Sequence, residues 1–316
     1  MPFSVCRDGE PVPTALRRAV VAIGNFDGVH RGHQALIAAA RDGGRRVGRP
    51  AAALTFEPHP RAFFKPDEPL FRLTPEPVKL VLLERQDLDA VFVRRFDEGL
   101  AALSAEAFVS TLLVEELAVA GVVVGHDFHF GRGREGDPAR MQELCRAHAL
   151  TCTIVPTVSE WGCIVSSSAI RAALARGDVA LANRLLGYRW FVRAEVRHGD
   201  KRGRALGYPT ANLRLSDDCR LRHGIYAVRV VRDRGTFDAV ASFGRRPTFD
   251  NGAPLLEVHL FDFAGDLYGR SLDVEFVGWI RGEELFESIE ALVAQMDRDS
   301  SRARAMLAAD EEPKDS

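Results

Sequence analysis

A strand that turns sharply into a helix is predicted for Gly24-Asn25-Phe26-Asp27-Gly28-Val29-His30-Arg31-Gly32-His33, near the amino terminus. The apolar run 19–26 predicts a buried strand. Gly28 permits a tight turn. The residues that follow predict a helix over 32–41, closed by Gly43 and Gly44. This order of elements is the beginning of an α/β unit.

Two histidines, His30 and His33, lie where this helix begins. Free backbone N–H groups and the positive end of the helix dipole attract phosphate at such a position. Two imidazoles would donate to α-phosphate oxygens as charge builds during nucleotidyl transfer, and Gly32 would let a nucleotide approach the backbone. A purely structural pair, or two zinc ligands, would have the same spacing. Zinc is disfavoured because no adjacent glutamate base or third ligand follows.

The rest of the first half alternates strands and helices. Strands are predicted over 51–56, 90–94, 120–125 and 152–155. Helices are predicted over 75–84, with Thr74 as N-cap and Pro75 as the first helical residue, over 104–117, capped by Ser104, and from Pro138, capped by Asp137. This alternation predicts a parallel sheet covered by helices on both faces, with ligands beyond the carboxyl ends of the strands.

The pattern changes after Gly187. Strands are predicted over 193–198, 224–231, 238–243, 255–261 and 271–277, and several alternate apolar with polar residues. Gly and Pro turns separate them, which indicates a small antiparallel barrel. One long helix or two over 283–307 and an acidic tail follow. We therefore expect one domain over 1–186, a second over 187–308 and a tail over 309–316.

Composition excludes several classes of protein. The chain has 316 residues, 46% of them hydrophobic, and a net charge of −2, which gives no general attraction to nucleic acid or membrane. No apolar run reaches the roughly 18 residues of a membrane span. The five cysteines are scattered without a Cys-x-x-Cys pair. We expect a protein of the reducing cytoplasm that binds small molecules, and its oligomeric state stays open.

A second candidate site lies in Gly199-Asp200-Lys201-Arg202-Gly203-Arg204-Ala205-Leu206-Gly207-Tyr208-Pro209-Thr210-Ala211-Asn212-Leu213. Basic, Gly-rich loops surround phosphates with N–H groups and positive charge. Thr210 and Asn212 offer the oxygen ligands that Mg²⁺ prefers. The alternative is a β-hairpin whose turn carries these polar residues without binding a ligand. Glu257, in an alternating strand, would by its pattern alone be an exposed strand residue.

The first half resembles the nucleotidyltransferase superfamily, whose signature is HxGH. Its form GxFDGVHxGHQ resembles the adenylyltransferase half of prokaryotic bifunctional riboflavin kinase/FMN adenylyltransferases. Three further segments match in the family's order: 55–60 (Thr-Phe-Glu-Pro-His-Pro), 125–131 (Gly-His-Asp-Phe-His-Phe-Gly) and 166–171 (Ser-Ser-Ser-Ala-Ile-Arg). The resemblance implies a Rossmann-like domain with His30 and His33 as catalytic residues. It also implies ATP contacts at Gly24, Phe26, Asp27, Gly28, Gly32, Ser167, Ser168 and Arg171, and FMN contacts at Phe56, Pro58, His59, Pro60, Asp127 and Phe128.

The second half resembles riboflavin kinase, whose signature is Gly-Tyr-Pro-Thr-Ala-Asn, found here at 207–212. The resemblance implies a β-barrel kinase domain with a carboxyl-terminal helix and with Glu257 as the catalytic base. It implies ATP and flavin contacts at Gly203, Arg204, Gly207, Pro209, Thr210, Asn212 and Arg270, with Thr210 and Asn212 near Mg²⁺. The whole enzyme would use ATP to convert riboflavin into FMN and then FMN into FAD.

Some residues depart from this family pattern. Asp127 stands where some relatives have asparagine, and Ser242 stands where an asparagine is common. The segment 131–136 fits GxGxxG, but the apolar run 120–124 ends well before it, which disfavours a dinucleotide site. Two other hypotheses are a nucleotidyltransferase with a passive barrel and a non-enzymatic flavin- or nucleotide-binding regulator.

Overall fold

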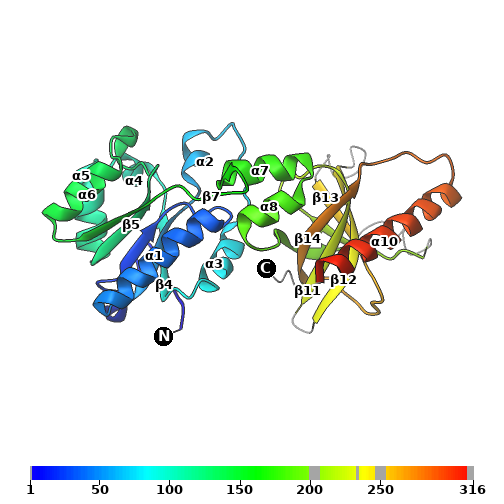
Figure 1. Cartoon of the computed structure of the whole chain (residues 1–316), viewed down its shortest axis with the longest axis horizontal. Helices are drawn as coiled ribbons and strands as arrows, with labels where there is room; N and C mark the ends of the chain where they lie inside the picture. Colours follow the sequence, from blue (N-terminus) through cyan, green and yellow to red (C-terminus); the bar gives the residue numbers. More distant parts are fainter. Residues whose placement is uncertain (1, 199–206, 233–234, 246–253, 312–316) are drawn as a thin grey trace. The chain divides into compact units, whose positions relative to one another are not determined.

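The structure is a computed structural model that describes residues 2–198, 207–232, 235–245 and 254–311. By its internal contacts the chain divides into two units, Met1–Ser167 and Ser168–Ser316. Each unit is described by itself, and Figure 1 follows the chain from its amino to its carboxyl end.

The first unit contains a parallel sheet with the strand order β1-β4-β3-β2-β5-β6. Its strands are β1 (Ser4–Arg7), β2 (Val20–Ile23), β3 (Ala51–Glu57), β4 (Ala90–Arg95), β5 (Gly121–Gly125) and β6 (Thr151–Val155). The helices are η1 (Thr14–Leu16), α1 (Arg31–Val47), α2 (Pro60–Phe64), α3 (Glu76–Glu84), α4 (Glu98–Ala102), α5 (Ala105–Ala107), η2 (Phe108–Glu116), η3 (Arg132–Arg134) and α6 (Pro138–Ala147). The predicted parallel sheet is confirmed.

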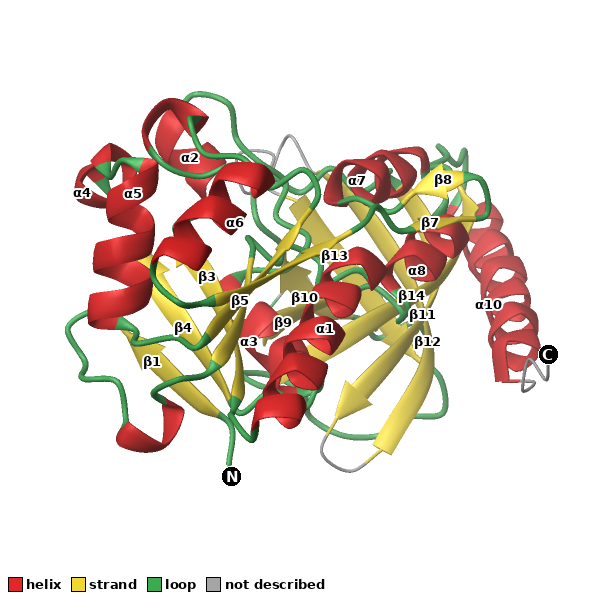
Figure 2. Cartoon of the chain, turned by 60° about the vertical axis from the view of Figure 1, so that its left-hand side comes forward, coloured by secondary structure: helices red, strands yellow, loops and turns green. Residues whose placement is uncertain are grey.

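Helices cover both faces of this sheet (Figure 2). Side chains of a strand alternate between faces, so Val21 and Ile23 of β2 point into one apolar cluster together with residues of η2 and α6. Helix α1 packs against β2, β3 and β5 and contributes no residue to that cluster. It therefore covers the opposite face, where its buried Ile37 and Ala40 lie.

Helix α1 does not end at Gly43 and Gly44 as predicted, but continues to Val47 and ends at Gly48, whose φ is +64°. Gly44 is needed for a close approach of two backbone segments. A Cβ on Gly44 would lie 2.6 Å from the carbonyl oxygen of Arg49. Two adjacent glycines predict the end of a helix. In the structure they lie inside α1, and the absence of a side chain at Gly44 allows a packing contact instead.

The predicted N-cap role of Thr74 is also wrong. Helix α3 has Pro75 at its N-cap position, without a side-chain cap. The hydroxyl of Thr74 instead accepts the N–H of Gly28 at 2.8 Å. By contrast, the predicted caps Ser104 and Asp137 are confirmed, each accepting a backbone N–H three residues later. The helix after Ser104 changes at Phe108 to π-type hydrogen bonding.

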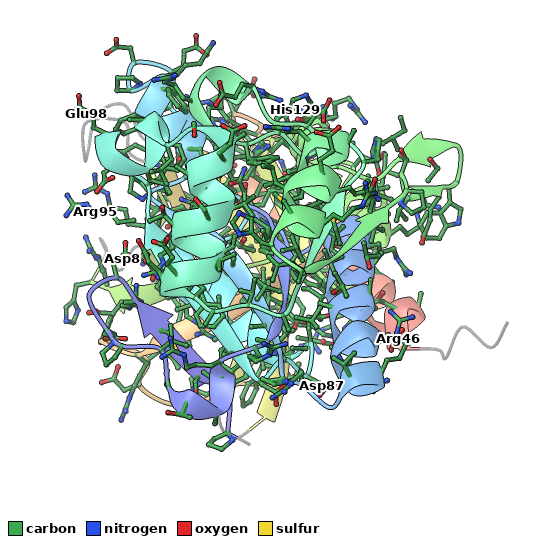
Figure 3. All side chains as sticks on the ribbon, turned by 90° about the vertical axis from the view of Figure 1, so that its left-hand side faces the viewer. Asp8, Arg46, Asp87, Arg95, Glu98 and His129 are labelled. Atoms are coloured by element: carbon green, nitrogen blue, oxygen red, sulfur yellow. The ribbon has the colours of Figure 1, made fainter. Side chains whose placement is uncertain are left out.

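Strand β1 at the edge of the sheet was not predicted. It has only four residues and pairs with β4 alone. Asp8, directly after β1, accepts hydrogen bonds from the guanidinium of Arg94 and the backbone of Arg95. Asp8 and Arg95 are labelled in Figure 3. The hairpin of β7 (Ser159–Glu160) and β8 (Cys163–Ile164) was not predicted either, because its strands, like β1, are too short to show a clear pattern.

The second unit contains a closed antiparallel barrel, as predicted, with the order β10-β13-β12-β11-β14-β9. Its strands are β9 (Phe191–Arg197), β10 (Ala211–Arg214), β11 (Gly224–Arg232), β12 (Gly235–Arg245), β13 (Pro254–Leu260) and β14 (Ser271–Arg281). Its helices are α7 (Ser167–Arg176), α8 (Val179–Leu186) and α10 (Ile289–Glu311). Buried Leu213, Tyr226, Phe243 and Phe276 come from four of these strands.

Helix α10 packs along β11, β12 and β14 (Figure 1). It begins at Ile289, six residues later than predicted, because Ser288 accepts the N–H of Ala291 and so marks the helix start. Its buried Ala303 and Leu307 form an apolar cluster with residues of β11 and β14. The barrel and α10 therefore share a core outside the barrel.

The contacts place α7 and α8 in the second unit, whereas the sequence assigned them to the first domain. Helix α8 packs on β14, and Asn183 bonds both the carbonyl of Phe276 and the N–H of Trp190. The backbone of Arg222 donates to Leu174 of α7. The packing boundary thus lies at Ser167 and Ser168, and a division of activities near Gly187 stays a prediction.

No helix in the described ranges combines the length and the apolar character that crossing a membrane requires.

Replacing Gly44 by alanine tests the close approach in α1. A helix-interior Gly→Ala change ordinarily stabilises by about 0.5–1 kcal/mol. We expect Gly44→Ala instead to lower the free energy of unfolding by about 1–3 kcal/mol, the usual cost of overpacking. Urea unfolding of the full chain measures this. Gly43→Ala is the control, because its added Cβ would meet side chains and no backbone atom: Val20 at 3.2 Å and Arg46 at 3.9 Å. Equal effects of the two changes would contradict the prediction.

Candidate active sites

The turn between β2 and α1 is held by a buried carboxylate. Asp27 is 1% exposed. It accepts the backbone N–H groups of Leu73 and Thr74, at 3.3 and 3.0 Å. Phe26 and Val29 on either side have positive φ, of 50° and 36°. Such backbone conformations cost of order 1–3 kcal/mol each and persist only where surroundings impose them, so Asp27 fixes a strained turn.

This turn delivers His30 as the N-cap of α1. The Nδ1 atom of His30 accepts the backbone N–H of His33 at 3.2 Å, so its proton lies on Nε2. The two imidazoles stack, with ring centroids 3.6 Å apart and planes 15° from parallel. Gly32 lies between them, where a Cβ would come within 3.1 Å of the His30 ring.

The Nδ1 atom of His33 is buried and has no hydrogen-bond partner among the described residues. A buried N–H without an acceptor is rarer than a buried lone pair without a donor. We therefore assign the proton of His33 to Nε2 as well. Burial, the neighbouring His30 and the positive charge of Lys79 hold the pKa of His33 well below its usual value of 6.5. Two neutral, stacked imidazoles thus each carry an Nε2–H donor at the start of α1.

The carboxyl ends of three adjacent strands, β3, β2 and β5, bring the other predicted residues to the same edge of the sheet. Gly24 directly follows β2 and donates its N–H to Leu54. Phe56 lies near the end of β3, with Pro58 after it and His59 and Pro60 at the start of α2. After β5 come exposed Asp127 and half-buried Phe128, whose ring stacks on Phe130. His129, labelled in Figure 3, follows them.

The serine-rich segment divides between the units. Ser167 belongs to the first unit, and its hydroxyl donates to the carbonyl of Asp27 at 2.8 Å. Ser168 and Arg171 lie in α7, in the second unit. Ser167 therefore supports the β2–α1 turn directly, and the phosphate contacts of Ser168 and Arg171 stay predictions.

In the barrel, strand register brings two predicted residues together. Asn212 of β10 is the direct partner of Glu257 of β13, and Ser242 of β12 is the partner of Glu257 on its other side. Their chain neighbours, such as Leu213 and Leu256, are fully buried. Since successive side chains alternate, the half-buried Asn212 and Glu257 lie side by side on the outer face. An amide and a carboxylate thus share one surface next to Thr210.

The segment that leads into β10 is tied down at two points. Tyr208 donates its hydroxyl to Asp297 of α10. The carbonyl of Pro209 lies 2.9 Å from Nδ1 of His259. Gly207 has a φ of +82°, which favours glycine at this point. Arg270 is exposed in the turn before β14. Gly203 and Arg204 lie outside the described residues.

A cluster of charged side chains next to the β2–α1 turn was not predicted from the sequence. It is formed by Glu57, Arg72 and Lys79. Lys79 is fully buried, and its Nζ lies 2.7 Å from Glu57. Arg72 donates to both oxygens of Glu57. The signal was present, because Lys79 lies three and four residues before buried Leu82 and Leu83 and so occupies the apolar stripe of α3.

Comparison with known proteins defines the class of this chain. Residues 12–169 match the family model for FAD synthetase, and residues 186–307 match that for riboflavin kinase. The chain is thus a two-domain protein with an FAD synthetase domain followed by a riboflavin kinase domain.

Relatives with this arrangement are bifunctional riboflavin kinase/FMN adenylyltransferases. That of Escherichia coli K12 is 43% identical over 286 residues, covering 90% of this chain and 91% of the relative. Those of Pseudomonas fluorescens and Bacillus subtilis are 42% and 37% identical, covering 92% and 90% of this chain and 94% and 92% of the relatives. The chain belongs to the bifunctional riboflavin kinase/FMN adenylyltransferase family.

A solved structure with the same fold is named as a macrolide-efflux protein from Streptococcus pneumoniae. It is 30% identical, with a TM-score of 0.85, and the match covers 96% of this chain and 99% of that structure.

The low pKa of His33 predicts a pH-dependent stability. In the unfolded chain His33 takes up a proton near its ordinary value of 6.5, whereas folded His33 stays neutral to lower pH. The unfolded state therefore binds more protons below pH 6.5, so this histidine lowers the free energy of unfolding as pH falls. The contribution of His33 to the free energy of unfolding changes with pH by at most about 1.4 kcal/mol per pH unit. Urea unfolding between pH 8 and 5 should show a flatter profile for His33→Asn than for wild type.

The control for that comparison is His129→Asn, because His129 is exposed. It should keep the wild-type slope. The interpretation is wrong if His33→Asn and wild type lose stability in parallel over the whole range.

Proposed function

We propose that this chain makes FAD from riboflavin in two ATP-dependent steps. The barrel transfers the γ-phosphoryl group of ATP to riboflavin, which gives FMN. The first unit then transfers AMP from ATP to FMN, which gives FAD and releases pyrophosphate. The observation that carries this proposal is that each unit brings together a set of polar side chains suited to phosphate chemistry: the stacked His30 and His33, and the paired Asn212 and Glu257.

In adenylyl transfer, the Nε2–H groups of His30 and His33 donate to oxygens of the α-phosphate as negative charge develops there. The phosphate of FMN attacks the α-phosphorus, and pyrophosphate leaves. The start of α1 adds free N–H groups and its dipole. ATP contacts are proposed at Gly24, Phe26, Asp27, Gly28, Gly32, Ser167, Ser168 and Arg171. FMN contacts are proposed at Phe56, Pro58, His59, Pro60, Asp127 and Phe128.

In the kinase step, Glu257 accepts the proton of the ribityl 5′-hydroxyl as that oxygen attacks the γ-phosphorus. Thr210 and Asn212 would hold Mg²⁺, since a hydroxyl and an amide oxygen are ligands of the type this cation takes. The cation offsets phosphate charge when bound. ATP and flavin contacts are proposed at Gly203, Arg204, Gly207, Pro209 and Arg270.

We also propose a cytoplasmic location, with small-molecule substrates as the partners. The five cysteines are free thiols, which fits a reducing compartment. The functional boundary is proposed near Gly187, at the start of the residues that the riboflavin kinase family model matches, 186–307.

Two substitutions separate the activities. We expect His30→Ala to lower FAD formation from FMN and ATP by about 10²–10³-fold, because it removes a donor to the transition state. FMN formation from riboflavin should be unchanged. Glu257→Gln should lower FMN formation by about 10²–10⁴-fold, because it removes the general base, and should spare FAD formation when FMN is supplied. Chromatography of the flavin products measures both rates. Loss of both activities in each variant would refute the division of labour.

Removal of Mg²⁺ tests the cation. With excess EDTA both product flavins should fall to background, and added MgCl₂ should restore them, because the triphosphate needs charge compensation in both steps. Thr210→Ala should raise the MgCl₂ concentration needed for FMN formation without changing that for FAD formation. Activity that persists in EDTA would rule out the cation requirement.

A further inference from the structure

Lys79 of α3 is fully buried beneath the β2–α1 turn, and each of its three N–H donors has an acceptor. Its Nζ lies 2.7 Å from Oε1 of Glu57 and 2.9 Å from Oγ1 of Thr55. It also donates to the backbone carbonyl of Asn25, at 3.3 Å. Three acceptors match the three donors of an ammonium group. Through Asn25 this cation contacts the segment that carries His30 and His33.

The charges around Lys79 are balanced and linked. Arg72 donates to both oxygens of Glu57, at 3.1 and 2.8 Å, and its Nε lies 3.8 Å from Asp27. Burial raises the pKa of Glu57, but the hydrogen bond from Arg72 and the charge of Lys79 outweigh it and hold this pKa below the usual value. Burial lowers the pKa of Lys79, and the charge of Glu57 opposes that effect. The cations Lys79 and Arg72 and the carboxylates Glu57 and Asp27 thus form one linked cluster that contacts the β2–α1 turn.

Stability does not account for this arrangement. The desolvation of a buried ion pair often cancels its attraction, and apolar residues of similar size frequently stabilise as well or better. Lys79 moreover occupies a position in the apolar stripe of α3, between buried Val78 and Leu82. A leucine or methionine there would satisfy the fold. Neither leucine nor methionine provides a donor to Asn25 or a positive charge near His33, whereas the ammonium group of Lys79 provides both.

We propose that Lys79 is a positioning residue for adenylyl transfer, which holds the β2–α1 turn, and with it His30 and His33, through Asn25 and Thr55. The proposal rests on the roles proposed above for His30 and His33. The ionisable groups around His33 and its neighbour Lys79 are His30 on the turn, Glu57 on β3, and Asp27 and Arg72 in the loops. His30 and Lys79 add to the effect of burial in lowering the pKa of His33.

The test is Lys79→Met in the full chain, which keeps the length of the side chain and removes its charge. FAD formation from FMN and ATP should fall by about 10²-fold, the scale of a misplacement of about 1 Å. FMN formation from riboflavin in the same preparation should keep the wild-type rate. The acid limb of the pH profile of FAD formation should move to higher pH, because His33 then takes up a proton more easily.

Lys65→Met is the matched control, because Lys65 is exposed and its ammonium group pairs with Glu68 on the surface. It should leave both rates and the pH profile unchanged. If Lys79→Met does not fold, Thr55→Val provides the same test more mildly: it removes one acceptor of Lys79 and should lower FAD formation by about 10-fold.

Three results are decisive. A wild-type rate of FAD formation in Lys79→Met would overturn the proposal. A reduced rate with an unmoved acid limb would make Lys79 merely structural and would also overturn it. If instead His30→Ala retained FAD formation, the proposed function of the His pair would fail, and that outcome is independent of Lys79.

Discussion

The hydrogen bonds from the backbone of Leu73 and Thr74 to the buried carboxylate of Asp27 hold the β2–α1 turn of the first unit together. They impose positive φ values on Phe26 and Val29, which an unsupported turn would not keep. The position of His30 as the N-cap of α1 and its stacking on His33 follow from that turn. A loop 46 and 47 residues along the chain therefore defines where the imidazoles lie.

Much of the first unit could be predicted because its strands are apolar runs and its ligand edge follows from the strand-end rule. The residues after β2, β3 and β5 were expected at one edge, and the strand order places them there. What could not be predicted depends on partners distant in the chain. The position of Thr74 before Pro75 predicts a helix cap, yet its hydroxyl accepts the N–H of Gly28. Gly44 was taken for a helix stop because its close approach to Arg49 has no local signal.

In the second unit, alternation predicted which residues face outward but not which strands are neighbours. The pairing of Asn212 with Glu257 joins residues 45 positions apart, and register across that distance is set by the closed barrel. Helices α7 and α8 have helical patterns that suit either domain. The packing of α8 on β14, together with the bonds of Asn183 to Phe276 and Trp190, places this helix in the second unit. Long-range contacts thus fixed the features that local patterns left open.

The interior of the barrel is filled by side chains such as Tyr226, Phe243 and Phe276, while Asn212 and Glu257 lie on its outside. Filling the core and presenting chemistry are therefore tasks of different residues on the same strands. Natural drift or directed evolution can change outward residues that do not pack against α10 without disturbing the packing that keeps the strands closed. The barrel is in this sense a durable scaffold whose surface is open to new ligand preferences.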